Sequence, residues 1–185
     1  MTSLPSLAPG QTVLETPRLV IRNWRGDDVE PLTEANGDPE VTEFLGGPHP
    51  AERTALWLEA TRLLIEQNGY GHFALERKRD ARWIGFCGLK IQQLPEGRYL
   101  ELGYRLARSA WGAGLATEAA CAIRDWAFER LPYGLLIAII APGNARSIRV
   151  AEKAGMAPLW ESTFCGREVR IYGLENPHGG RREAL

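Results

Sequence analysis

Apolar positions along the chain change their spacing several times, and each change marks the boundary of a predicted element. The first segment alternates apolar and basic side chains, as a strand does when one of its faces is buried. Two further segments space their apolar residues three or four positions apart, which predicts helices. The expected order therefore begins with a strand over residues 14–24 and helices over residues 29–36 and 51–68.

The middle of the chain returns to strand-like alternation. Residues 72–76, 83–91 and 99–106 alternate in polarity and are separated by turn residues, so we expect three strands in an antiparallel meander. An apolar face with helical spacing follows over residues 116–131. Residues 135–141 are apolar throughout, which predicts a strand that is buried on both faces.

The remaining pattern completes a mixed α/β architecture. A helix is expected over residues 146–154, with Gly155 just beyond its end, and an antiparallel pair over residues 157–164 and 168–174. The order β-α-α-β-β-β-α-β-α-β-β predicts a sheet of about seven strands with about four helices on both faces. The strand–helix–strand unit in the middle should be a right-handed parallel crossover.

Composition is that of a globular protein, with 185 residues of which 44% are hydrophobic and 24% charged. We expect one domain over residues 13–175, between tails at 1–12 and 176–185.

The net charge of the chain is −1 and no basic stripe is evident, which argues against a nucleic-acid partner. No apolar run reaches the ~18 residues of a membrane span, and the first residues lack a signal-peptide pattern. A cytoplasmic protein without a membrane partner is therefore expected.

The three cysteines fit neither a disulfide framework nor a metal motif. Cys87, Cys121 and Cys165 are odd in number and far apart in the sequence. Each has apolar neighbours, so we expect buried free thiols. No set of His, Cys, Asp and Glu residues has the spacing of metal ligands, so no metal is expected.

Residues 101–120 (ELGYRLARSAWGAGLATEAA) carry the strongest chemical signal. A predicted strand leads into a turn that contains Gly112 and Gly114, and the turn opens a helix. The first turn of a helix has unpaired N–H groups and a partial positive charge, and glycine lets an anion approach the backbone. The glycines predict either a phosphate site or an ordinary strand-to-helix turn. The pattern is neither a P-loop nor a dinucleotide fingerprint, because the required lysine and third glycine are missing.

Four segments in this order resemble the GNAT superfamily of acetyl-CoA-dependent N-acetyltransferases. They are LETPRLVIR at 14–22, DPEVTEFL at 38–45, LELGYRL-x4-WGAGLATEA at 100–119 and NARSIRVAEKAGM at 144–156. More narrowly, the chain is similar to the branch typified by the ribosomal-protein N-terminal acetyltransferases RimJ and RimL, over about residues 13–174. The resemblance implies a GNAT fold in which two middle strands splay apart and the pantetheine arm of acetyl-CoA enters the opening.

The resemblance also implies which residues bind acetyl-CoA as cosubstrate. They belong to the first splayed strand (Tyr104, Arg105 and Leu106), to the pyrophosphate loop (Trp111, Gly112, Ala113, Gly114, Leu115 and Ala116) and to the start of the later helix (Asn144). Backbone groups would make most of these contacts. Family members often have Gln or Arg three positions before the first loop glycine, where this chain has Ser109 with Arg108 beside it.

The implied reaction is direct transfer of an acetyl group to a primary amine. The amine must lose a proton, directly or through water, and the departing thiolate must be protonated by a donor. Glu101 resembles the family's strand glutamate and is the candidate base; the alternative is an exposed glutamate paired with an arginine. Ser147 is the candidate donor of the RimL-like branch; the alternative is a helix-capping serine. Ala151 stands where many members have a tyrosine as general acid, which is a departure from the family pattern.

The acceptor remains open between two kinds of amine. The resemblance favours a protein N-terminal alanine or serine, while amino acids, polyamines and aminoglycosides are small-molecule alternatives. Arg53, Arg62, Arg77 and Arg105 could favour an acidic acceptor, although surface arginines are common. Transfer of a longer acyl group and a non-catalytic acyl-CoA sensor are further alternatives. Because many relatives are dimers, the resemblance also allows a homodimer.

Overall fold

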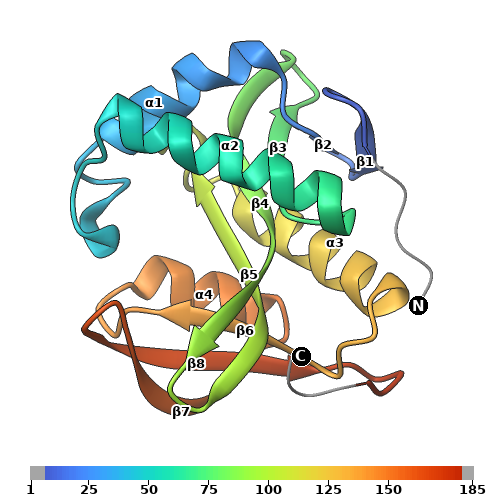
Figure 1. Ribbon diagram of the computed structural model, residues 1–185, viewed down its shortest axis with the longest axis vertical. Helices are drawn as coiled ribbons and strands as arrows, with labels where there is room; N and C mark the ends of the chain where they lie inside the picture. Colours follow the sequence, from blue (N-terminus) through green and yellow to red (C-terminus); the bar gives the residue numbers. More distant parts are fainter. Residues whose placement is uncertain (1–6, 181–185) are drawn as a thin grey trace. The chain divides into compact units, whose positions relative to one another are not determined.

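The computed structural model describes residues 7–180, and Figure 1 follows the chain through its helices and strands. Residues 1–6 and 181–185 of the two expected tails lie outside the described residues. The α-helices are α1 (Val29–Gly37), α2 (Ala51–Asn68), α3 (Leu115–Arg130) and α4 (Ala145–Lys153). The strands are β1 (Thr12–Glu15), β2 (Leu19–Arg22), β3 (His72–Arg77), β4 (Arg82–Leu94), β5 (Gly97–Leu106), β6 (Leu135–Ile140), β7 (Ala157–Phe164) and β8 (Arg167–Glu175).

The strands form one mixed sheet in the order β1-β2-β3-β4-β5-β6-β8-β7. Strands β1 to β4 pair antiparallel with their neighbours, and so do β6, β8 and β7. Strands β5 and β6 pair in parallel, with α3 between them in the chain. This arrangement confirms the predicted mixed α/β class and the parallel strand–helix–strand unit.

The single strand predicted over residues 14–24 is wrong, because the chain forms the hairpin β1–β2 there. The N–H of Thr16 donates to the carbonyl of Leu19 (2.9 Å), and the N–H of Leu19 donates to Thr16 Oγ1 (3.0 Å). Between them, Pro17 has a ring-fixed φ that suits a turn and lacks the N–H that a strand interior needs. The hairpin brings the sheet to eight strands.

The chain divides into two compact units, and the first contains the described part of Met1–Gly88 together with Tyr104–Ala119. In this unit α1 packs against α2. Its interior also holds a fully paired arginine: Arg22 donates from Nη1 and Nη2 to the two carboxylate oxygens of Asp28, each at 2.8 Å, and from Nε to Glu76 at 2.9 Å. Burial lowers the pKa of Arg22, and hydrogen bonds and charge from both carboxylates outweigh it, so the pKa lies above its ordinary value.

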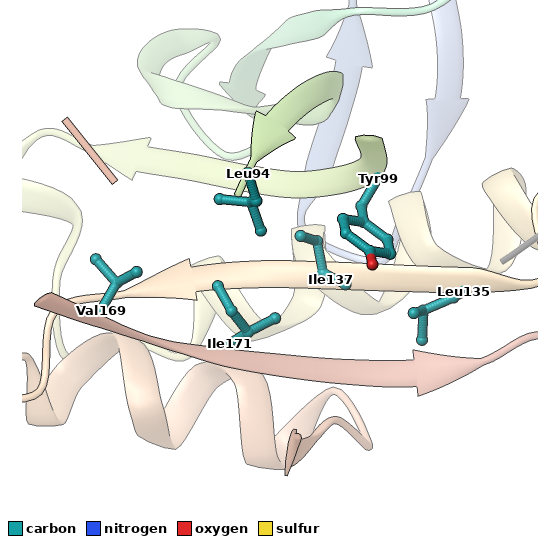
Figure 2. Close-up of a cluster of buried hydrophobic side chains, with 6 residues drawn as sticks. All are labelled: Leu94, Tyr99, Leu135, Ile137, Val169 and Ile171. Carbon is teal, nitrogen blue, oxygen red and sulfur yellow. The ribbon is translucent and has the colours of Figure 1, made fainter. Parts of the chain in front are cut away.

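The second unit contains Leu89–Gly103 and the described part of Ala120–Leu185. Figure 2 shows how side chains from β4, β5, β6 and β8 gather in its apolar cluster. Leu135 and Ile137 are two positions apart on β6 and therefore point to the same face. The residue between them, Leu136, is fully buried on the opposite face. The prediction that this strand is buried on both faces is therefore confirmed.

The prediction of three buried thiols holds only for Cys87. All three cysteines are free, but Cys121 is half-buried and Cys165 is exposed. Cys165 has φ 51° and is followed by Gly166 with φ 73°, in the two-residue turn between β7 and β8. Two positive φ values in such a turn match the twist of the hairpin strands. The turn geometry therefore places Cys165 outside the core despite its apolar neighbours.

Among residues 7–180, no helix combines the length and the apolar character that crossing a membrane requires.

Candidate active site

The predicted phosphate loop lies between the end of β5 and the start of α3. Gly112 and Gly114 both have φ +76°, in the left-handed region that L side chains rarely adopt. A Cβ on Gly112 would meet nothing within 4 Å, so the backbone conformation, and not crowding, requires glycine at this position. This geometry agrees with a loop whose backbone faces a ligand.

The first turn of α3 offers donors that the helix itself does not use. The N–H of Glu118 donates to the carbonyl of Gly114 (3.1 Å), the first i to i−4 bond of the helix. The N–H groups of Leu115, Ala116 and Thr117 precede it and therefore have no acceptor within the helix. Together with the positive end of the helix dipole they can bind an anion such as a pyrophosphate.

A clamp from the β1–β2 turn holds this loop, and sequence analysis missed it. Arg18 donates from Nη1 to the carbonyl of Ala113 (2.8 Å) and from Nε to Glu118 Oε2 (2.6 Å). The N–H of Arg18 and the hydroxyl of Thr16 both donate to Glu118 Oε1. Burial raises the pKa of Glu118, but these hydrogen bonds and the charge of Arg18 bring it below its ordinary value. Glu118 is thus an ionised anchor of the loop, in addition to its favourable place at the helix N-terminus.

The end of β5 and the start of the loop are fixed by close backbone contacts. A Cβ on Gly85 of β4 would lie 2.3 Å from the carbonyl oxygen of Arg105, so only glycine permits this approach. The indole N–H of Trp111 donates to the carbonyl of Leu106 (2.9 Å). Arg108, near the loop, pairs with Glu40 (2.6 Å). Its charge is therefore already partly compensated within the protein.

Glu101, the candidate base, lies on β5 in the second unit. Burial raises its pKa above the ordinary value, while a hydrogen bond from Gln92 and the charge of Lys90 act in the opposite direction. The ladder between β5 and β6 consists of the pairs Leu100–Leu136 and Glu101–Ile137 and does not continue at the next two residues of β5. Glu101 therefore stands where the pairing of the two strands ends, as expected for strands that splay.

Asn144 and Ser147 lie together at the start of α4, also in the second unit. Asn144 is the N-cap residue, and its Oδ1 accepts from the N–H of Ser147 (3.0 Å). The helix is thus capped by Asn144 and not by Ser147, which is on the first turn as predicted. Ala151 is 1% exposed, so the position of the usual tyrosine is part of the core here.

The far end of α4 follows the sequence prediction. Gly155 has φ +82° and donates to the carbonyl of Glu152, while Met156 donates to the carbonyl of Ala151. This pair of bonds is the Schellman ending of a helix, which needs glycine in the left-handed region. Gly155 therefore ends α4, whose bounds are each one residue earlier than predicted.

Arg105 is the least compensated arginine in the interior of the first unit. Its Nη1 donates to Asn36 Oδ1, and its guanidinium lies 5.4 Å from the centre of the Phe86 ring. Its Nε is buried without a hydrogen-bond partner, and no carboxylate among residues 7–180 forms an ion pair with it. Burial, assisted by the charge of Arg53, lowers the pKa of Arg105 to about 10.

His49 belongs to the same group of side chains. Its backbone N–H donates to the carbonyl of Asn36 (2.9 Å), and its ring atom Nε2 is buried without a partner. Burial lowers the pKa of His49, and the charges of Arg105 and Arg53 lower it further, against a hydrogen bond with the backbone of Leu45. Sequence analysis named Arg105 both for its backbone contacts and, with three other arginines, as a charge that could favour an acidic acceptor, but nothing local in the sequence separates its side chain from theirs.

The predicted site residues are divided between the two units. The first unit contains Tyr104, Arg105, Leu106 and the loop residues 111–116, while the second contains Glu101, Asn144 and Ser147. The second unit also has a hollow of about 530 Å³, lined by Pro95, Glu96, Pro142 and the β7–β8 hairpin, to which no predicted residue contributes. Over residues 7–180, no group of three His, Cys, Asp or Glu side chains could hold a metal ion.

Comparisons with known proteins give the family. A family model described as "Acetyltransferase (GNAT) domain" matches residues 18–157. The chain is 38% identical over 119 residues to the uncharacterized protein YkkB of Bacillus subtilis (strain 168), covering 64% of this chain and 69% of that protein. It is 29% identical over 166 residues to the uncharacterized N-acetyltransferase p20 of Bacillus licheniformis, covering 86% and 92% of the two chains.

A solved structure agrees with the family match. The crystal structure of an acetyltransferase from Agrobacterium tumefaciens str. C58 is similar to this chain at a TM-score of 0.75 and 27% identity, covering 94% of this chain and 96% of that one. The family model spans most of the chain, including β5, the glycine loop, α3 and the whole of α4. The mixed sheet with its parallel β5–β6 pair and the loop that opens α3 are thus those of an acetyltransferase, and this chain belongs to the GNAT family.

Proposed function

We propose that this chain transfers an acetyl group from acetyl-CoA to a primary amine by direct attack, without an acyl-enzyme. The observation that carries the proposal is the loop at the start of α3, where two left-handed glycines precede three N–H groups without helical acceptors. Such a loop fits the pyrophosphate of acetyl-CoA, the cosubstrate that GNAT acetyltransferases use. The clamp by Arg18 and Glu118 holds the loop in place before the ligand arrives.

In this proposal the cosubstrate is held largely by backbone groups. Tyr104, Arg105 and Leu106 would hydrogen-bond the pantetheine arm, and residues 111–116 would bind the pyrophosphate. Asn144 would contact the cosubstrate at the start of α4. Bound acetyl-CoA supplies a thioester, whose carbonyl carbon accepts the amine and whose sulfur leaves as a thiolate.

Glu101 and Ser147 are the proposed acid–base residues. Glu101 accepts the proton of the attacking amine through a water molecule, the new N–C bond forms and the C–S bond breaks. The hydroxyl of Ser147 is the donor toward the departing thiolate. Burial that raises the pKa of Glu101 strengthens it as a base, because a carboxylate of higher pKa holds a proton better. The rate is expected to rise with pH as Glu101 ionises.

For the acceptor we propose a protein N-terminal amine of the RimJ/RimL type, with a small-molecule amine as the alternative. The similarity of residues 14–22, 38–45, 100–119 and 144–156 to that branch supports the first choice. A homodimer is a proposal with the same support, and a cytoplasmic location is a proposal that agrees with the three free thiols. Sedimentation of the purified chain measures the oligomeric state directly.

The proposal is tested by release of free thiol from acetyl-CoA in the presence of acceptor panels. The panels contain Ala-, Ser- and Met-initiated peptides, polyamines, amino acids and aminoglycosides, and thermal shifts with acetyl-CoA run in parallel. Turnover that disappears when the acceptor amine is blocked supports the proposal. Stabilisation by acetyl-CoA without turnover on any class contradicts transfer and favours an acyl-CoA sensor. Absence of stabilisation contradicts the phosphate loop itself.

A matched pair of variants tests the base. Glu101→Gln should lower kcat by about 100-fold or more, the usual contribution of general base catalysis, and should remove the rise of rate with pH. Glu66→Gln changes the same residue type at an exposed position of α2 and should leave both unchanged. An unaltered pH profile in Glu101→Gln would assign the base to another group.

A further inference from the structure

One edge of the Arg105 guanidinium, formed by Nε and Nη2, has no hydrogen-bond acceptor among residues 7–180. Nη1 of Arg105 donates to Asn36 Oδ1, and the Arg105 side chain forms no other hydrogen bond within residues 7–180. The remaining donors, Nε and Nη2, point in parallel from the same edge of the guanidinium. A carboxylate binds two such donors at once, which an ammonium or a hydroxyl group cannot do.

The guanidinium is held in place although its charge is not compensated. Asn36 is 1% exposed, and its Nδ2 donates to Thr54 Oγ1 (3.1 Å) of α2, which fixes the amide that orients Arg105. The face of the guanidinium lies over Phe86, whose ring centre is 4.7 Å from that of Trp57. Asn36 and Phe86 thus orient the guanidinium of Arg105, while its Nε–Nη2 edge has no partner. This arrangement suits a bound ligand and not a structural ion pair.

The surroundings of Arg105 are cationic or neutral, which determines the charge of that ligand. The charge of Arg53 lowers the pKa of Arg105, and the charges of Arg105 and Arg53 both lower the pKa of His49. Neither Arg53 nor His49 is an anion. An uncompensated buried charge is costly, so an anion that binds here recovers part of that cost. Arg105 also lies between Tyr104 and Leu106, the strand residues proposed to hold the pantetheine arm.

We propose that Arg105, flanked by Arg53 and His49, binds a carboxylate of the acceptor, so that the preferred acceptor is an amine that carries a carboxylate. The inference rests on the proposed function, since it names the substrate class of the same site. The carboxylate belongs either to a small molecule or to an acidic residue near a protein N-terminus, and the chemistry of recognition is the same.

Paired acceptors that differ only in a carboxylate test the proposal. The peptide pair Ala-Glu-Gly-amide and Ala-Gln-Gly-amide probes an acidic side chain, and the pair Ala-Gly and Ala-Gly-amide probes a terminal carboxylate. The acid member of at least one pair should have a kcat/KM roughly 10- to 100-fold higher, the range of a charge-assisted hydrogen-bonded pair. A preference within the first pair indicates a protein N-terminus, and one confined to the second pair indicates a small molecule. Equal kcat/KM within both pairs overturns the proposal.

Variants assign the preference to Arg105. Arg105→Met should abolish it, and Arg105→Lys should keep only part of it, because lysine retains the charge but cannot bind side-on. Arg79→Met removes an equal charge from the exposed β3–β4 turn and should keep the full preference. Thermal unfolding verifies that each variant is folded. A preference that persists in Arg105→Met, or a raised KM for acetyl-CoA in place of a lost preference, overturns the proposal.

Calorimetry separates failure of this inference from failure of the proposed function. Titration of the same pairs into the protein saturated with CoA measures acceptor binding without turnover. Absence of turnover on every acceptor contradicts the proposed transfer, while tighter binding of the acid members still supports the role of Arg105. Equal binding of acid and amide members contradicts that role, whatever the activity.

Discussion

Two arginines in the interior of the first unit, Arg22 and Arg105, have opposite surroundings. Arg22 is 2% exposed, and its Nε, Nη1 and Nη2 all donate to carboxylates, so its pKa is raised. Arg105 has a neutral amide as its hydrogen-bond partner and Arg53 as a neighbouring charge, and its pKa is lowered to about 10. Arg22 therefore has the features of a structural ion pair, while Arg105 has those of a site that awaits an anion. Burial of an arginine alone does not distinguish the two roles; the charge of its partners does.

The largest expected effect is on stability at Arg22. Arg22→Met leaves Asp28 and Glu76 without their buried partner, and should lower the free energy of unfolding by about 3–5 kcal/mol. Urea unfolding followed by circular dichroism measures the change. Arg79→Met is the surface control and should stay within about 0.5 kcal/mol of the parent. A loss at Arg22 no larger than that of the control would contradict the structural role.

Asn36→Asp should make Arg105 resemble Arg22. The new carboxylate would accept from Arg105 and neutralise it, so the preference for carboxylate-bearing acceptors should fall by about tenfold or more. The ratio of kcat/KM for the peptide pair measures it. Asn68→Asp adds the same charge at the exposed end of α2 and should not alter the ratio. An unchanged ratio in Asn36→Asp would argue against an anion site at Arg105.

Arg105→Met should change stability far less than Arg22→Met. No ion pair is lost, and an uncompensated charge leaves the interior, so the free energy of unfolding should change by less than about 1 kcal/mol in either direction. The same urea titration measures it, with Arg22→Met as the reference. A loss of several kcal/mol would show that Arg105 is a structural residue.

The smallest expected effect concerns the protonation of His49. Its folded-state pKa lies below the ordinary value because of burial and of the charges of Arg105 and Arg53. The unfolded chain therefore binds this proton more readily, and the contribution of His49 to stability is lost as the pH falls below about 6.5. His49→Gln should flatten that part of the stability profile. In Arg105→Met, NMR titration should find that the pKa of His49 is raised, because a positive charge has been removed. An unchanged pKa would show that the charge of Arg105 does not act on His49.

Elements with a strong local pattern were predictable nearly to the residue. The periodicity over residues 51–68 gave α2 with the observed bounds, and Gly69 ends it with φ +72°. The strand expected over residues 157–164, as half of an antiparallel pair, likewise has the bounds of β7. Such patterns report which face of a helix or strand is buried, and this information is contained within a few neighbouring residues. The β1–β2 hairpin was missed because the alternation of residues 18–22 belongs to β2 and its immediate start, whereas the turn at Thr16 and Pro17 separates it from β1.

The candidate site was predictable only where backbone groups, and not side chains, are expected to bind the ligand. Gly112 and Gly114 stand at a turn that requires positive φ, and this requirement is visible in the sequence. The clamp of that loop was not visible, because Arg18 and Glu118 are 100 positions apart. Nothing in the sequence around Glu118, on the first turn of α3, distinguishes a glutamate that only interacts with the helix dipole from one that pairs with a distant arginine.

The sequence by itself therefore determined every α-helix and strand except the β1–β2 hairpin, together with the glycine loop and the family to which the chain is similar. The tertiary structure decided which charges meet. Arg22 and Glu76 are 54 positions apart, and Arg105 and Asn36 are 69 apart, so their pairing depends on how strands and helices pack. Electrostatic energy depends on distance in space and on burial, and neither is a local property of the chain. For this reason two arginines that both lie on strands of the first unit differ in pKa, in partners and in proposed role.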